Sequence, residues 1–96
     1  MKLLEVKDST KADKKLMAIF ESDTGRKKTT HFGASGMDDY TITKDKAQRD
    51  RYRTRHKKDL DTGDPTKAGF LSFHILWGES TSRAANISAY KKKYNL

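Results

Sequence analysis

Hydrophobic and polar residues alternate in the first third of the chain, which is typical of a sheet with one buried face. Leu4 and Val6 lie two residues apart with charged neighbours, and this spacing predicts a first strand. Residues 16–21 predict a second strand and residues 27–32 a third. Each run has the length of a short strand, so the chain is expected to begin with three strands.

Turn residues and a polar loop separate these strands. Asp23–Arg26 has the composition of a tight hairpin turn, in which Gly25 is free to adopt a positive φ. Residues 8–15 are polar and predict a loop between the first two strands. Because short connections join neighbouring strands in antiparallel order, residues 1–33 are expected to form a β-meander.

The pattern of the strands ends at Gly33–Gly36, where two glycines follow the third strand. Residues 37–42 predict a short irregular link, and a helix is expected over residues 44–58. Thr43 is the expected N-cap, because its hydroxyl can accept a hydrogen bond from the first turn. Asp45 then lies in that turn, where a carboxylate interacts favourably with the helix dipole.

Two more helices are predicted in the last third of the chain. Asp64 followed by Pro65 is a strong start signal, and Gly78 is expected to end this second helix. A third helix is expected to begin at Ser80 or Thr81. Apolar faces at helical spacing support both helices: Ala68, Leu71, His74 and Ile75 in one, and Ile87, Tyr90 and Tyr94 in the other.

The predicted elements define an α+β fold in a single domain, residues 1–96. A three-stranded antiparallel β-meander is followed by three helices, residues 43–96, packed on one face. The chain has 96 residues, of which only 33% are hydrophobic, so the core is expected to be small and the stability marginal. The predicted core residues are Leu4, Val6, Met17, Ile19, Phe32, Leu71, Ile75, Trp77, Ile87 and Tyr90.

Positive charge is concentrated in the first predicted helix. Lys+Arg 21 against Asp+Glu 13 gives the chain a net charge of +8. Residues 44–58 hold eight bases and two acids, which leaves +6 in this segment. The segment has few apolar residues, and Tyr52, His56 and Leu60 form a thin stripe that can lie on the sheet. Its other faces are basic.

The candidate function of this segment is anion binding. Arg49 and Arg53 are one helical turn apart, as are Arg51 and Arg55, and arginine favours bidentate contacts to phosphate or carboxylate. The alternative is a solvated face that only keeps the protein soluble. The candidate anion-binding residues are Lys46, Arg49, Arg51, Arg53, Arg55, Lys57 and Lys58 on the helix, with Arg26, Lys27 and Lys28 at the hairpin turn.

A third basic cluster, residues 91–93, separates Tyr90 from Tyr94 near the end of the last helix. Two interpretations are open. The tyrosine rings can stack on bases while the lysines contact phosphates. The helical spacing favours the other interpretation, in which both tyrosines pack inward and the lysines extend into solvent.

No catalytic, metal or cofactor site is predicted. The chain has no cysteine, which excludes disulfides, thiolate zinc sites and a cysteine nucleophile. His31, His56 and His74 lie on different elements, and residues 59–64 depart from the calcium-loop pattern and are expected to form a surface loop. The carboxylates of residues 38–39 have no second acidic cluster at helical spacing. A non-enzymatic protein without a small-molecule substrate is therefore expected.

A membrane-spanning segment is not expected either. The longest apolar run, Leu16–Phe20, has five residues, whereas a spanning helix needs about 20. The acidic, alternating start of the chain is unlike a signal peptide, so a protein that is not secreted is expected.

Several spaced motifs are similar to those of one protein family: His31–Gly36, Asp39–Thr41, Lys44–Asp45, Arg49–Tyr52, Arg55–His56, Asp64–Thr66, Ala68–Gly69, Ile75–Trp77 and Tyr90–Tyr94. Together they resemble the small basic uncharacterised proteins of large double-stranded DNA viruses of the chlorovirus and mimivirus type. Residues 60–63 depart from that pattern, because they lack the Asn and Trp of the family loop. The resemblance implies a viral source and a location in the virion or inside the host cell, in cytoplasm or nucleus.

Charge and resemblance together suggest a binding or structural protein of a large DNA virus. Such a protein is expected to be a minor virion component that docks on an acidic viral protein or on nucleic acid. One alternative is a nucleic-acid-binding protein that acts on the genome or on transcripts. A more remote alternative is a metal-dependent nuclease that uses Asp38 and Asp39. Steep salt dependence of binding would favour nucleic acid, and loss of activity in EDTA would favour the nuclease.

Overall fold

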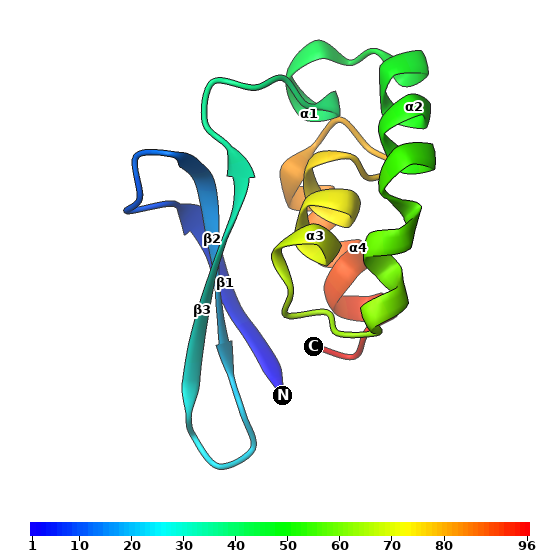
Figure 1. The fold of residues 1–96 in the computed structure, drawn as a ribbon. Helices are drawn as coiled ribbons and strands as arrows, with labels where there is room; N and C mark the ends of the chain where they lie inside the picture. Colours follow the sequence, from blue (N-terminus) through cyan, green and yellow to red (C-terminus); the bar gives the residue numbers. More distant parts are fainter.

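The computed structural model describes residues 1–96 and contains one antiparallel sheet followed by helices (Figure 1). The sheet has the order β1-β2-β3, with β1 at Lys2–Asp8, β2 at Lys14–Glu21 and β3 at Lys27–Ala34. The helical part consists of α1 (Tyr40–Thr43), α2 (Lys46–His56), the 3₁₀-helix η1 (Lys57–Thr62), α3 (Ala68–Leu71), the π-helix η2 (Ser72–Leu76) and α4 (Arg83–Lys93). The predicted α+β class and the three-stranded antiparallel sheet are confirmed.

The continuous segment α3–η2 lies at the centre of the molecule. On one side it packs against β3 of the sheet, and on another it packs against α4. Helix α2 lies on the far side of this segment from the sheet (Figure 1). None of the helices is both long enough and apolar enough to cross a membrane.

A β-bulge in β1 decides which residues of this strand face the core. Leu3 pairs with Phe20 and Glu5 pairs with Ile19, so Leu4 is an extra residue in the ladder. As a result Leu3 is 2% exposed, whereas Leu4 is 44% exposed. The prediction that Leu4 belongs to the core is therefore wrong. The spacing of Leu4 and Val6 placed both residues on one face, but the bulge changes which residues of the strand face the core.

The second strand is also turned over relative to the prediction. Leu16, Ala18 and Phe20 face the helices and belong to the core cluster. Met17 is buried as expected, at 7% exposure, but it lies outside that cluster on the opposite face of the sheet, where the half-buried Ile19 also lies. All five residues from 16 to 20 are apolar, so no polar neighbour indicates which alternate set faces inward.

The helical half of the core matches the prediction more closely. Leu71, Ile75, Trp77 and Tyr90 are buried as expected, together with Phe32 from β3. Val6 and Ile87 are partly buried against this cluster, and the prediction missed Leu3, Leu16, Ala18, Phe20, Phe70 and Leu76. Gly33 adopts a positive φ of 79°, which favours glycine, and a Cβ there would lie 2.6 Å from Cδ1 of Leu76, so that side chain would have to shift.

The start of the basic helix differs from the prediction by two residues. Asp45 is its N-cap, and the Asp45 carboxylate accepts a hydrogen bond from the backbone N–H of Gln48 at 3.2 Å. Thr43 instead ends α1, a single helical turn within the segment that was expected to be irregular. Asp39 caps α1, and Lys44 ends it with a left-handed conformation at φ 57°.

The start signal at Asp64 forms a turn and not a helix. The Asp64 carboxylate accepts hydrogen bonds from the backbone N–H and the hydroxyl of Thr66, at 2.9 and 2.7 Å. Helix α3 begins only at Ala68, and the expected loop at residues 59–64 is mostly 3₁₀-helical. The last helix is capped by Ser82, whose hydroxyl accepts from the N–H of Ala85. The capping residues in the sequence therefore indicated the correct regions for the helices, but not the residues at which the helices begin.

The bulge generates a paired test. Leu3→Ala removes a buried side chain and is expected to lower the free energy of unfolding by about 2–5 kcal/mol. Leu4→Ala changes an exposed side chain and is expected to stay within about 0.5 kcal/mol of the parent protein. Urea unfolding followed by circular dichroism measures both. A larger loss in the Leu4 variant would contradict the bulged register.

Candidate anion-binding surface and adjoining pocket

The outer surface of α2 and η1 carries five exposed basic side chains that no carboxylate neutralises. They are Lys46, Arg51, Arg55, Lys57 and Lys58. None of them takes part in an ion pair of the structure. We refer to these five residues as the basic face. That the basic face binds an anion stays a prediction, but its charges are free to do so.

Arg53, in contrast, is directed into the protein. Its Nη1 donates a hydrogen bond to the carbonyl of Trp77 at 2.8 Å and lies 3.5 Å from the carbonyl of Phe73. Its guanidinium carbon lies 4.2 Å from the centre of the Phe73 ring. These contacts satisfy carbonyl groups at the end of η2, which is where a helix leaves its acceptors unpaired. The expectation that Arg53 is a free anion-binding residue is therefore corrected.

Arg49 is also largely covered, because its side chain is only 15% exposed. Its Nε lies 3.4 Å from a carboxylate oxygen of Asp50, and its guanidinium carbon lies 5.4 Å from the centre of the Tyr40 ring. Arg49 thus neutralises the neighbouring acid and packs on α1. Like Arg53, it does not belong to the exposed set that the sequence suggested.

Burial affects the charge of Arg53. Removal of solvent lowers the pKa of Arg53 from its ordinary value, and the nearby positive charge of Arg49 lowers this pKa further. Glu79 and Asp50 act in the opposite direction. An arginine with a lowered pKa still remains cationic at neutral pH, so the hydrogen bond to Trp77 is charge-assisted.

The apolar stripe of α2 was expected to lie on the sheet. It packs instead on Trp77, the residue that follows η2. The Tyr52 ring lies between the rings of His56 and Trp77, with centroid distances of 4.1 and 4.2 Å. Both pairs are stacked. Leu60 continues this contact and is partly buried against the core. Because α3–η2 lies between α2 and most of the sheet, the stripe does not pack on the strands.

The structure brings one further lysine next to the basic face. Lys93 of α4 and Lys57 of η1 line the same groove, whose volume is about 330 Å³. The sequence placed these residues in two separate clusters. The hairpin cluster does not join them, because the β2–β3 turn projects beyond the helices (Figure 1). Arg26, Lys27 and Lys28 are exposed there, and Lys28 Nζ donates to the Thr66 hydroxyl at 2.8 Å.

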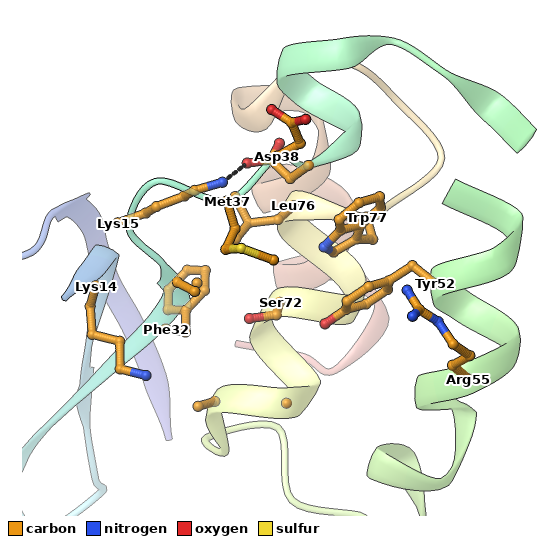
Figure 2. A pocket seen from close by; sticks show the side chains of 15 residues that line it. Lys14, Lys15, Phe32, Met37, Asp38, Tyr52, Arg55, Ser72, Leu76 and Trp77 are labelled. Atoms are coloured by element: carbon orange, nitrogen blue, oxygen red, sulfur yellow. Dashed lines mark hydrogen bonds and ion pairs between the residues drawn. The ribbon is translucent and has the colours of Figure 1, made fainter. Parts of the chain in front are cut away.

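A pocket of about 330 Å³ lies between the sheet and the helices (Figure 2). It was not predicted, because its lining residues come from separate segments of the chain. Those that matter for its chemistry are Lys14 of β2, Phe32 of β3, Tyr52 and Arg55 of α2, Ser72 of η2, and Trp77. Arg55 also belongs to the basic face, so the pocket opens next to that surface.

Asp39 lines this pocket and connects several of the elements around it. Its side chain is only 1% exposed, and it accepts a hydrogen bond from Lys15 Nζ at 2.6 Å. Arg83 Nη2 lies 3.3 Å away on α4, and the hydroxyl and the backbone N–H of Thr41 also donate to the carboxylate. The sequence had suggested Asp38 and Asp39 as a remote candidate for metal chemistry. The Asp39 carboxylate is instead occupied by two cationic side chains.

These contacts determine the protonation of Asp39. Burial by itself raises the pKa of Asp39, but the hydrogen bonds from Lys15 and Thr41 and the charges of Lys15 and Arg83 together outweigh burial. The net effect lowers the pKa of Asp39 below its ordinary value of 3.8. Asp39 is therefore ionised at neutral pH and stabilises the folded state.

The three histidines lie in separate environments. His31 Nδ1 is 2.7 Å from the Ser9 hydroxyl, and His56 Nδ1 is 3.1 Å from Asp59 Oδ2. His74 Nε2 is 3.0 Å from the Tyr94 hydroxyl. Burial, followed by the charges of Lys93 and Arg53, lowers the pKa of His74 to about 4, so this ring is neutral at pH 7. No group of three His, Asp or Glu side chains is placed to hold a metal ion.

This sheet, its basic helix and the adjoining pocket define a small basic α+β protein. Residues 4–56, more than half of the chain, match the model of a family of unknown function, DUF5754. The chain therefore belongs to the DUF5754 family. The matched segment runs from β1 to the end of α2 and so includes most of the basic face. No curated protein and no solved structure is significantly similar to the chain.

The ion pairs of Asp39 generate a first prediction for this site. Asp39→Asn leaves Lys15, whose side chain is 12% exposed, without a counter-charge, and is expected to cost about 3–5 kcal/mol of stability. Asp38→Asn, at an exposed neighbour, is expected to change stability by less than about 0.5 kcal/mol. Urea unfolding at pH 7 compares the two variants, and equal effects would show that the Asp39 ion pairs do not stabilise the fold.

The lowered pKa of Asp39 also predicts the acid dependence. A carboxyl whose folded-state pKa lies below its unfolded value contributes stability above the unfolded pKa. This contribution is lost as the pH falls from about 4 through the lower pKa of the folded state. Unfolding measured between pH 7 and pH 2 is expected to show a shallower acid dependence in Asp39→Asn than in the parent protein.

Because Arg53 points inward, its substitution is expected to lower stability more than substitution of the exposed Arg51. Arg53→Gln removes a charge-assisted hydrogen bond and the contact with the Phe73 ring, and is expected to cost about 1.5–3 kcal/mol. Arg51→Gln removes the same charge from the exposed surface and is expected to be nearly neutral. Thermal melting of both variants is the measurement. If Arg53→Gln melts with the parent protein, the bond to the Trp77 carbonyl contributes nothing.

Proposed function

We propose that this protein is a non-enzymatic nucleic-acid-binding protein, and that the basic face contacts the phosphate backbone. The observation that carries the proposal is the exposure of Lys46, Arg51, Arg55, Lys57 and Lys58 without a carboxylate partner. Positive side chains that are free of internal ion pairs can neutralise phosphates and release bound counterions. Lys93, across the groove from Lys57, extends the same charge onto α4.

The dimensions of the helix support a backbone contact. From Lys46 to His56 the helix axis extends about 15 Å. Duplex DNA carries about nine phosphate charges over that length, so several basic side chains can engage phosphates together. No zinc-finger spacing or zipper repeat supplies sequence readout. The proposal is therefore binding through the backbone with little dependence on base sequence.

The resemblance to small basic proteins of large DNA viruses adds a biological setting to this proposal. In that setting, the nucleic acid is a viral genome or its transcripts, and the protein acts in the virion or inside the host cell. An acidic viral protein presents carboxylates in place of phosphates and is the competing partner. The two partners differ in the salt dependence of binding, because counterion release from a duplex is much steeper.

A charge-matched pair of variants tests the basic face. Arg51→Gln with Lys58→Gln is expected to leave melting unchanged, because exposed charges contribute little to stability. The same change is expected to reduce the salt slope of duplex binding by about two, at about 0.9 per lost phosphate contact. Fluorescence anisotropy of a labelled duplex at several salt concentrations gives this slope.

The control removes the same charge elsewhere. Lys2 of β1 and Lys11 of the β1–β2 connection are exposed, and the sheet lies on the opposite side of α3 from α2 (Figure 1), so Lys2→Gln with Lys11→Gln is expected to change the slope much less. Equal loss in both double variants would assign binding to overall charge and overturn the assignment to α2 and η1. If polyglutamate binds while DNA and RNA do not bind even at low salt, the partner is an acidic protein.

A further inference from the structure

We propose that the pocket beside α2 accepts one unpaired nucleobase, while Arg55 and Lys14 contact the phosphates on either side of it. This inference rests on the proposed nucleic-acid-binding function and specifies its substrate as a single strand. It is carried by the shape of the pocket, by its unused polar groups, and by its position next to the basic face.

The pocket has the size and the walls of a site for a small planar group. Its volume of about 330 Å³ lies at the lower end of the range of ligand pockets, about 300–1,000 Å³. Phe32 of β3 lies on one side, and Tyr52 and Trp77 lie on the other (Figure 2). Seven of the fifteen lining residues are hydrophobic. The Tyr52 ring is stacked on His56 and Trp77, so it presents its edge and hydroxyl to the pocket. An aromatic base suits the apolar part of such walls because both of its faces are apolar.

Polar groups that can read a base edge line the same space. The Tyr52 hydroxyl, the Trp77 indole nitrogen and the Ser72 hydroxyl all face the pocket (Figure 2). No side-chain hydrogen bond joins these three groups to one another; the dashed line in Figure 2 joins Lys15 to Asp39. Burial raises the pKa of Tyr52 to about 12, which keeps its hydroxyl protonated and able to donate.

The charges around the pocket favour a base inside it and phosphates at its mouth. Lys15 is neutralised by Asp39, and the carboxylate of Asp38 lies on the lining, which disfavours a phosphate deep in the pocket. The unpaired cations are Lys14 and Arg55. Arg55 also lines a shallow groove on the outer surface of α2 with Arg51, Thr54 and Asp50, and the Asp50 carboxylate is paired with Arg49. A strand that follows the basic face therefore passes the pocket mouth.

A duplex cannot fill this pocket without losing a base pair. A base in a double helix is stacked and paired, and its extrusion costs a few kcal/mol, whereas a single strand has unpaired bases available. The pocket thus predicts a preference for single strands over duplexes, which the basic face alone does not produce.

Trp77 is the only tryptophan, and its ring forms part of the pocket wall, so its fluorescence reports on occupancy. Short oligothymidylate is expected to change Trp77 emission and to bind roughly tenfold more tightly than a duplex of the same length. Thymidine monophosphate is expected to produce the same emission change at higher concentration. Inorganic phosphate, which has no base, is expected to leave the emission unchanged.

Two variants test the pocket without touching the basic face. Ala68 lines the pocket on the exposed first residue of α3, and Ala68→Leu is expected to fill part of it. The Tyr52 hydroxyl has no hydrogen-bond partner among the pocket residues, so Tyr52→Phe is expected to melt with the parent protein. Both variants are expected to lose most of the single-strand preference and to keep the duplex affinity and its salt slope.

The outcomes separate this inference from the proposed function. If single strands and duplexes bind equally and Trp77 emission stays constant, the pocket is not used, whereas the backbone-binding function stands. The same conclusion follows if both variants keep the parent's preference for single strands. If neither nucleic acid binds the parent protein at low salt, the proposed function fails and this inference fails with it. Circular dichroism of each variant checks that it is folded, so that a loss of binding is not the result of unfolding.

Discussion

The arrangement of the helices around the sheet depends on one buried carboxylate. Asp39 joins β2 through Lys15 and α4 through Arg83, and its own backbone begins α1. An ionised carboxylate at 1% exposure is tolerated only when cations and hydrogen-bond donors surround it, so these elements can meet in few ways. Because α2 follows α1 after a short link, the same contact also fixes where the basic helix begins.

Asp39 fixes where α2 begins, and the aromatic contacts of α2 fix its orientation. Tyr52 stacks on the Trp77 ring, and Arg53 donates to the Trp77 carbonyl. Trp77, directly after η2, is therefore contacted by both an aromatic ring and a cation of α2. These two contacts select the rotation of the helix about its axis. Arg51 and Arg55 then point to solvent, whereas Arg49 and Arg53 point inward. The basic face is therefore a consequence of how α2 is anchored as well as of its composition.

The sequence was sufficient for the fold class, the order of the strands and longer helices, and most helical core residues, because spacing and turn residues are local signals. It failed where a contact between distant residues decides the outcome. The bulge at Leu4 depends on pairing with β2, and the inward orientation of Arg49 and Arg53 depends on Tyr40 and η2. The pocket could not be predicted from the sequence for the same reason, because β2, β3, α2 and η2 contribute its walls.

The bulge in β1 also bears on how the protein behaves at high concentration. A free strand edge offers a row of unpaired N–H and C=O groups to other chains, and natural proteins protect such edges with bulges and charges. β1 is an edge strand that carries both devices, with the extra residue at Leu4 and charged side chains at Lys2, Glu5 and Lys7. The backbone N–H of Leu3 donates to the carbonyl of Leu96 at 3.3 Å, so the end of the chain covers part of this edge. Self-association by strand addition is therefore disfavoured on this side of the sheet.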